Sequence, residues 1–267
     1  ASVEVEVKKP VIRTDETRDF LHSSVTTLDL SNIDFIENIS AELYNNDTLL
    51  TASDNGIFTF DCSKAEVGES YLYVKTNTFI YELPAVFYTH KITTKDEWID
   101  YTKNGFKGGK DAARTAEKLR DGYIILADDI DMNGEVFALN TFDSGKYQNA
   151  NEAEAAKDRF YGVFDGRGHT IYNVKIGRQG FFGCVAPESV IKNVAFADVC
   201  IAEEVNWFIG VFSHFMYGTV DNCYVELNYM PDIKGVGGIT RYLYGTIENS
   251  VVFIKQEDKS SNADTHG

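Results

Sequence analysis

Apolar and polar residues alternate in short stretches along residues 1–90, which is the pattern of β-strands with one buried face. Clusters of Asn, Asp, Ser and Gly separate these stretches, and such clusters favour tight turns. The first third of the chain is therefore expected to consist of short strands with short connections. The predicted strands lie at Val3–Val7, Leu28–Leu30, Ala41–Leu43, Ile57–Phe60, Tyr71–Val74 and Phe79–Tyr88.

Six or seven strands in about ninety residues are typical of a β-sandwich of the immunoglobulin type. The Cys–Trp–Cys signature of antibody domains is absent, which argues against an antibody-type domain. In its strand pattern this segment resembles the bacterial Ig-like modules of surface proteins. Residues 1–90 are accordingly predicted to form an Ig-like β-sandwich.

A different pattern begins after residue 90. Thr94 and Glu97 have the spacing of a capping box, in which each side chain bonds the backbone of the other at a helix start. Trp98 then opens an apolar stripe, and a second helical stretch is predicted at Asp111–Arg120. The Gly-rich stretch Asn104–Gly109 between them follows a helix, so it does not fit a phosphate-binding loop. We expect helices within about residues 94–120 to cap a second domain, residues 91–267.

From Tyr123 onward the sequence repeats. The asparagines Asn173, Asn193, Asn222 and Asn249 close four similar stretches and lie 20, 29 and 27 residues apart. The glycines that precede them lie 18, 30 and 28 residues apart, so both landmarks drift together. Short strands in repeats of this length cannot close a core alone, which predicts a solenoid whose unit is one coil of a parallel β-helix.

Equivalent residues of stacked coils form columns. Two positions before each asparagine an aliphatic column is expected inside, and three positions after it a second apolar column: Ile171, Ile191, Val220 and Ile247, then Ile176, Phe196, Val225 and Val252. Asparagine tolerates a left-handed backbone, and its amide both donates and accepts. We therefore predict that the four asparagines form a structural hydrogen-bonded ladder rather than a binding site.

Five stretches of the second domain carry a resemblance to a known family: Gly122–Met132, Phe160–Phe164, Asp165–Ile171, Gly180–Gly183 and Val236–Ile239. Through them residues 91–254 resemble bacterial β-helix proteins with GLUG-type repeats. The resemblance implies a right-handed parallel β-helix in secreted or wall-attached bacterial proteins, with no established catalytic residues. The sequence departs from the family's glycine motif at Ser213 and Arg241.

The amino-acid composition limits the classes of partner that we expect for the chain. The 267 residues include 25 Lys and Arg against 41 Asp and Glu, so the formal net charge is −16. A phosphate backbone repels such a surface, which argues against nucleic acid as a partner. No apolar run reaches the roughly 18 residues of a membrane span, so no membrane insertion is expected. The polar tail after Ile254 offers little to cover the last coil, and the chain is expected to belong to a longer protein.

The four cysteines, Cys62, Cys184, Cys200 and Cys223, show no Cys-x-x-Cys spacing. Small buried side chains are the expected role, with a disulfide or metal role as the alternative. The redox compartment stays open.

Acidic residues offer two candidate sites. Asp129, Asp131 and Asn133 resemble the start of a calcium loop, although Asn140 stands where an EF-hand has its bidentate Glu. Asp221 and Glu248 are expected in one outward column, Tyr172, Lys192, Asp221, Glu248, where neighbouring carboxylates share a cation or raise a pKa. Asp165–Gly168 is predicted to be a tight turn, rather than a catalytic cluster with Arg167 and His169.

Exposed aromatic rings are the remaining candidates for binding. Tyr172 and Tyr224 are expected to face outward, and Trp207 lies near a predicted loop. These rings, with Asp221 and Glu248, favour a non-catalytic extracellular bacterial surface module that binds a glycan or a protein on a rigid β-helix. No cofactor is expected, with calcium as the one candidate. The alternatives are a polysaccharide lyase or glycoside hydrolase on the same scaffold, or a structural spacer.

Overall fold

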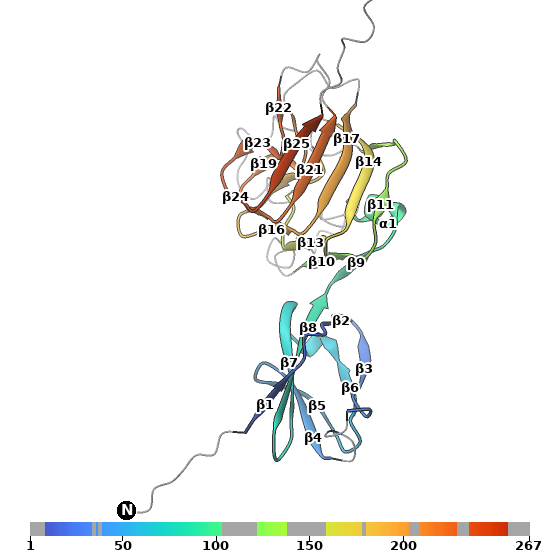
Figure 1. The fold of residues 1–267 in the computed structure, drawn as a ribbon, viewed down its shortest axis with the longest axis vertical. Helices are drawn as coiled ribbons and strands as arrows, with labels where there is room; N and C mark the ends of the chain where they lie inside the picture. The colour runs from blue at the N-terminus through green and yellow to red at the C-terminus, as the bar shows by residue number, and fades with distance from the viewer. Residues whose placement is uncertain are drawn as a thin grey trace, which may run out of the picture. The chain divides into compact units, whose positions relative to one another are not determined.

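The computed structural model of the protein describes residues 9–33, 36, 39–102, 122–137, 159–177, 180–202, 209–228 and 235–255. The fold is mainly β, and the chain divides into two compact units, Ala1–His90 and Lys91–Gly267 (Figure 1). The change of sequence pattern after residue 90 falls at this division.

Unit 1 contains two sheets. In the larger sheet the strand order is β1-β8-β7-β4-β5, and β2 also pairs with β8. Strands β7, β4 and β5 pair in antiparallel fashion, whereas β1 and β2 run parallel to β8; β3 and β6 form a separate antiparallel pair. The elements are β1 (Val11–Arg13), β2 (Arg18–Leu21), β3 (Val25–Asp29), β4 (Ala41–Asn45), β5 (Thr48–Ser53), β6 (Ile57–Asp61), the 3-10 helix η1 (Cys62–Lys64), β7 (Gly68–Lys75) and β8 (Ile80–Tyr88).

The two sheets of unit 1 share one apolar core. Phe58 of β6 and Phe87 of β8 are fully buried in the same cluster. The ring of Phe20 lies 5.6 Å from that of Phe60 and 5.3 Å from that of Phe87, so it joins both sheets. The alternating pattern of the sequence thus marks strands whose apolar faces meet.

The strands predicted between Leu28 and Tyr88 overlap β3, β4, β6, β7 and β8. The stretch Val3–Val7 lies outside the described residues. Strands β1, β2 and β5 were not predicted. Strand β5 ends the sheet order and buries only Leu50, so it lacks the regular alternation of a strand with one buried face.

Unit 2 begins with a short helix, α1 (Lys95–Asp100). The predicted capping box is confirmed, because the Thr94 hydroxyl accepts from the Glu97 backbone N–H and the Glu97 carboxylate accepts from the Thr94 backbone N–H. The predicted second helix, Asp111–Arg120, lies outside the described residues. Trp98 is the side chain that α1 buries.

Parallel sheets account for the other strands described in unit 2. The first parallel sheet has the order β24-β20-β16-β13-β10-β9, the second β11-β14-β17-β21-β25 with β12 beside β14, and the third β15-β19-β23; β18 pairs with β22. The second sheet is visible in Figure 1 as the row of strands from β14 to β25. The strands are β9 (His90–Ile92), β10 (Tyr123–Leu126), β11 (Ile130–Asp131), β12 (Val136–Phe137), β13 (Val163–Asp165), β14 (Thr170–Ile176), β15 (Gly183–Val185), β16 (Val190–Lys192), β17 (Ala195–Ile201), β18 (Ile209–Gly210), β19 (Ser213–Met216), β20 (Thr219–Asp221), β21 (Tyr224–Asn228), β22 (Val236–Gly237), β23 (Thr240–Leu243), β24 (Thr246–Glu248) and β25 (Val251–Lys255).

Successive strands of each parallel sheet come from successive repeats of the sequence. In the first sheet Phe164, Ile191 and Val220 lie side by side and are fully buried. At one end of this core Trp98 contacts a group of phenylalanine rings at centroid distances of 5.5 to 6.2 Å: Phe137, Phe164, Phe181 and Phe182. The repeats therefore share one continuous core that α1 helps to cover.

The predicted column of four asparagines is wrong at Asn173. Asn193, Asn222 and Asn249 each follow a strand of the first sheet, whereas Asn173 lies within β14 of the second sheet. There it lies level with Asp198, since Tyr172 pairs with Ala197 and Val174 with Val199. Both Asn173 and Asp198 have a positive φ, 55° and 48°.

The two predicted apolar columns change for the same reason. Ile171 lies beside Phe196 and Val225 in the second sheet, and Ile176 lies beside Ile201. In the first sheet Phe164 takes the place that Ile171 was expected to hold. The first interval of the asparagine series is the shortest, and it spans two strands of different sheets rather than one full repeat.

Replacing Trp98 by Ala is expected to lower the free energy of unfolding of unit 2 by about 3–5 kcal/mol, because the cavity would lie among the phenylalanine rings. Differential scanning calorimetry of the full chain measures the effect. Val136→Ala is the control, since Val136 is exposed in the same unit and its truncation should cost less than about 0.5 kcal/mol. Equal effects of the two variants would contradict this account of the core.

The burial of the four cysteines predicts which thiols react with an alkylating reagent in the folded protein. All are free thiols; Cys200 is half-buried and the others are buried. Burial raises the pKa of Cys223 to about 11, and it also raises the pKa of Cys62. Because the thiolate is the reactive form, iodoacetamide at about pH 8 should modify Cys200 in the folded protein and Cys223 only after denaturation. Peptide mass spectrometry reads this out, and early modification of Cys223 would refute it.

Candidate functional site

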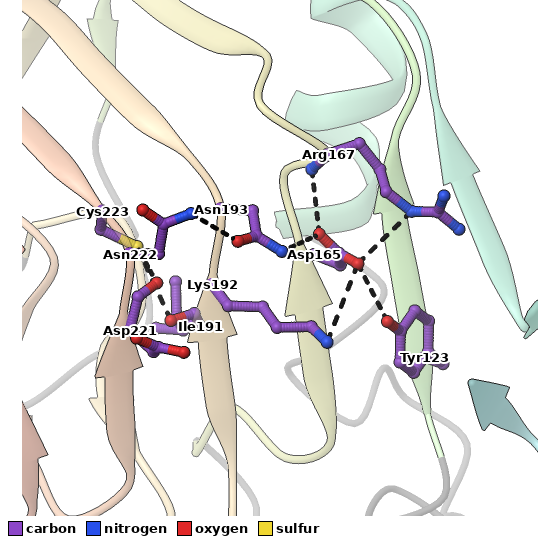
Figure 2. A network of polar contacts seen from close by, with 9 residues as sticks. All are labelled: Tyr123, Asp165, Arg167, Ile191, Lys192, Asn193, Asp221, Asn222 and Cys223. Atoms are coloured by element: carbon purple, nitrogen blue, oxygen red, sulfur yellow. Dashed lines mark hydrogen bonds and ion pairs between the residues drawn. The ribbon is translucent and has the colours of Figure 1, made fainter. Parts of the chain in front are cut away.

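The most densely bonded polar side chain drawn in Figure 2 is Asp165, the last residue of β13. Its Oδ2 accepts a hydrogen bond from the Tyr123 hydroxyl at 2.9 Å. Its Oδ1 accepts from the Arg167 backbone N–H and from the Asn193 side-chain amide, both at 3.0 Å. Asp165 thus joins β10, its own turn and the residue that follows β16.

Two cations also approach this carboxylate. Arg167 Nε lies 3.3 Å and Lys192 Nζ 4.0 Å from Asp165 Oδ2. Asp165 is only 2 % exposed, so its charge would be costly to bury without such partners. The turn Asp165–Gly168 forms as predicted, with the Asp165 side chain closing it. Asp165, Arg167 and His169 do not form one cluster, because His169 Nδ1 lies 3.4 Å from Asp129 Oδ1 instead.

The asparagines that follow the first sheet continue this network. Asn222 donates its side-chain N–H to Asn193 Oδ1 at 2.8 Å, one step of the ladder that was predicted. Asn249 donates to Asp221 Oδ1 at 2.8 Å instead of to Asn222. All three adopt a positive φ, between 48° and 54°. Each amide therefore links its own corner of the chain to the preceding repeat.

The equivalent corner after β13 is Gly166, and the packing explains why. A Cβ at this position would lie 2.4 Å from Val194 Cβ and 2.5 Å from the Asn193 carbonyl oxygen. No side chain fits there without displacing the backbone of the next repeat. The ladder consequently ends on the Asp165 carboxylate rather than on a fourth asparagine.

In the first sheet the register aligns Ile125, Asp165, Lys192, Asp221 and Glu248 in one column, of which Ile125 and Asp165 are buried. The prediction that Tyr172 belongs to this column is wrong, because Tyr172 is in the second sheet. Asp221 and Glu248 do lie opposite each other in register, as predicted. Asp221 is half-buried and Glu248 exposed, and Asp221 already accepts from Asn249.

The predicted calcium ligands are engaged in hydrogen bonds within the chain. Asp129 Oδ1 accepts from the Thr170 backbone N–H at 2.8 Å. Asp131 Oδ1 accepts from the Asn133 backbone N–H at 2.7 Å and from the Asn173 side chain at 3.0 Å. Within the described ranges no group of three or more His, Cys, Asp or Glu has a metal-binding arrangement. Calcium binding at these residues stays a prediction.

The outer face of the second sheet brings two predicted binding residues together. Burial alternates along β14, β17 and β21, so Tyr172 and Tyr224 point away from the core. Tyr172 lies level with Ala197, and Tyr224 lies level with Ala195. The two rings therefore stand on either side of β17, whose outward residues there are two alanines. Trp207 lies outside the described residues.

Polar groups border this face, which we call the tyrosine face and define by Tyr172, Ala195, Ala197, Tyr224 and Glu226. The Tyr224 hydroxyl donates to Glu226 at 3.3 Å, and burial together with this carboxylate raises the pKa of Tyr224. Glu226 also pairs with Lys255, and Lys175 and Asn228 lie further along the same strands. The face thus combines two rings, the small side chains of Ala195 and Ala197 and hydrogen-bonding groups.

Sequence reasoning identified Tyr172, Tyr224, Asp221 and Glu248, but the structure divides them between two sheets. Sequence reasoning did not identify Tyr123 as a hydrogen-bond partner of Asp165. The sequence did contain a signal for this site. At the end of β13 stand Asp165 and Gly166, whereas the later repeats have an asparagine in the second position: Lys192-Asn193, Asp221-Asn222 and Glu248-Asn249. A residue type that breaks a repeat marks a corner with different contacts.

Asp165→Ala is expected to lower the free energy of unfolding of unit 2 by about 3–5 kcal/mol, because the Tyr123 hydroxyl and the Asn193 amide lose their acceptor and two cations lose a buried counter-charge. Chemical denaturation measures the loss. Glu248→Ala removes the exposed carboxylate of the same column and should cost less than about 0.5 kcal/mol. A neutral Asp165→Ala variant would show that this network does not support the fold.

The chain matches no protein-family model, no curated protein and no solved structure. Among the described residues no helix is long and apolar enough to span a membrane. Two features of unit 2 stand out: the buried Asp165 network, and the tyrosine face, on which Tyr172 is exposed and Tyr224 is half-buried.

Proposed function

We propose that unit 2 is a right-handed parallel β-helix of the GLUG-repeat type and that unit 1 is a bacterial Ig-like module. Three parallel sheets whose neighbouring strands belong to successive repeats support the first assignment. Two mostly antiparallel sheets around a common core support the second. Both assignments fit a secreted or cell-surface protein of bacteria, which is the localisation we propose.

We further propose that the chain is a non-catalytic binding module whose ligand is a carbohydrate. The observation that carries this proposal is the tyrosine face, where Tyr172 and Tyr224 flank the two alanines of β17. Tyr rings offer an apolar surface to the C–H groups of a sugar and a hydroxyl at the rim. Glu226 and Asn228 add groups that can bond sugar hydroxyls.

The distance between the two tyrosines and the net charge of the chain indicate which kind of carbohydrate the face would bind. Strand β17 separates β14 from β21, so the strands that carry the two tyrosines lie about 10 Å apart. This separation suits neighbouring rings of one oligosaccharide better than one monosaccharide. The net charge of −16 disfavours acidic polysaccharides, and a neutral oligosaccharide from a host or from the environment is the proposed ligand.

The alternative of a polysaccharide lyase or glycoside hydrolase draws on Asp221 and Glu248. These carboxylates lie opposite each other, Asp221 one strand and Glu248 two strands beyond Lys192. Their column is on the first sheet, away from the tyrosine face on the second sheet. Turnover of a bound glycan that is lost in Asp221→Asn or Glu248→Gln would favour the enzyme over the binding module. A protein that binds no glycan would favour a spacer.

A glycan array with the full chain identifies neutral oligosaccharides, and titration calorimetry then tests the face. Tyr172→Ala and Tyr224→Ala are each expected to weaken binding about tenfold or more, as loss of an aromatic anchor does. Tyr71→Ala is the control, because Tyr71 is an exposed tyrosine of unit 1. Binding unchanged in both face variants would rule out this site.

A further inference from the structure

The sequence contains three Asn-Gly pairs, and two of them lie among the described residues: Asn55-Gly56 and Asn133-Gly134. The third, Asn104-Gly105, lies outside the described residues. In such a pair the backbone nitrogen of the glycine can attack the carboxamide of the asparagine, because glycine has no Cβ that hinders the approach. Since the two described pairs have the same chemistry, their surroundings decide how fast each reacts.

The pair Asn55-Gly56 connects β5 to β6, and hydrogen bonds hold the Asn55 carboxamide in this turn. Asn55 Oδ1 accepts from the Ile57 backbone N–H at 3.1 Å, which makes the segment an Asx-turn. The ring that this bond closes contains both Asn55 Cγ and Gly56 N, so the carboxamide is folded back toward the glycine. Asn55 is exposed, so hydroxide and water reach it.

Two donors are directed at the carboxamide oxygen of Asn55. The Ser53 hydroxyl donates to Asn55 Oδ1 at 2.8 Å, in addition to the Ile57 N–H. Attack on a carboxamide carbon places negative charge on this oxygen, and donors already in position stabilise that charge. Within the described residues the Gly56 N–H has no hydrogen-bond acceptor, so its proton is accessible to hydroxide.

The pair Asn133-Gly134 is held in a different way. The Gly134 N–H donates to the Asn173 carbonyl of β14 at 2.8 Å, so removal of its proton would break a bond between neighbouring repeats. The Asn133 N–H in turn donates to Asp131 Oδ1 at 2.7 Å. The nitrogen that would attack is therefore engaged in the fold.

We infer that Asn55 is a site of spontaneous deamidation in the folded protein and that the Asx-turn promotes the reaction. Hydroxide removes the Gly56 N–H proton, and the nitrogen forms a bond to Asn55 Cγ. The Cγ–Nδ2 bond then breaks, and the side-chain nitrogen takes a proton from water and leaves as ammonia. Water adds to either carbonyl of the resulting succinimide, which gives aspartate or isoaspartate at position 55. The reaction needs only water and hydroxide.

Isoaspartate would lengthen the backbone by one carbon at a closely packed point. The Gly56 carbonyl accepts from the Leu30 N–H at 2.9 Å. A Cβ on Gly56 would lie 3.0 Å from Ser31 Cα, so the glycine packs directly against the chain that follows β3. The next residue, Ile57, pairs with Asp29 at the end of the β3–β6 ladder. The modification should therefore loosen this end of the ladder and destabilise unit 1.

Peptide mass spectrometry of the full chain, incubated in mildly alkaline buffer, tests the inference. In the folded protein the peptide with Asn55 should deamidate at least about tenfold faster than the peptide with Asn133. In guanidinium chloride both pairs lose their surroundings, and the two rates should agree within about threefold. Equal rates in the folded protein, or an Asn55 that reacts more slowly folded than unfolded, would overturn the inference.

The variant Ser53→Ala separates the effect of the turn from that of the local sequence. It leaves Asn55-Gly56 intact and removes one donor to Oδ1, so the folded protein should deamidate about threefold more slowly or less. Ser63→Ala is the matched control, because the Ser63 hydroxyl bonds Asp61 in the same unit, and its rate should be unchanged. A Ser53→Ala variant that reacts as fast as the unaltered protein would show that the turn does not promote the reaction.

Chemical denaturation of aged protein tests the structural consequence. The aged chain should be labelled by an isoaspartate-specific methyltransferase and should unfold at a lower denaturant concentration than the fresh chain. Asn55→Gln should prevent both changes, because glutamine would have to close a larger ring. An equal loss of stability in aged Asn55→Gln would contradict the assignment to Asn55. The test is independent of the tyrosine-face proposal, since that face lies in unit 2.

Discussion

The structure of unit 2 depends on one constraint: no repeat can enclose its own core, so each must be covered by its neighbours. Phe164, Ile191 and Val220 illustrate this, because each is buried between the strands before and after it. The hydrogen bonds between parallel strands hold these side chains at a constant spacing. At the start of the stack, Trp98 of α1 packs against the first aromatic rings and supplies a cover of a different kind.

The corners between strands are held by polar side chains rather than by apolar packing. An amide suits a corner because it tolerates a positive φ and can donate to the preceding repeat, as Asn222 does to Asn193. At Gly166 the next repeat leaves no room for a side chain, so the carboxylate of Asp165 takes the role of the amide. The buried charge of Asp165 is balanced by the Tyr123 hydroxyl and by two cations. The contacts of Asp165 in Figure 2 thus connect β10, the turn after β13 and the residue that follows β16.

The residues exposed on unit 2 follow from the same stacking. Side chains on the outer face of a strand are not needed for the core, so Tyr172 and Tyr224 lie outside it. The edge of the last strand has no following repeat among the described residues, so Phe253 and Ile254 stay uncovered.

Local features could be predicted from the sequence alone, and features that depend on neighbours could not. Alternation marked most strands of unit 1, and spacing marked the capping box of Thr94 and Glu97, because each of these signals lies within a few residues. The corners at Asn193, Asn222 and Asn249 were marked by the recurrence of the same short stretch. The sheet to which Asn173 belongs was decided only in three dimensions, since a short interval can mean a short repeat or two strands of one repeat. The partners of Asp165 lie 42 and 28 residues away, and loop lengths that carry no pattern determine which strands become neighbours.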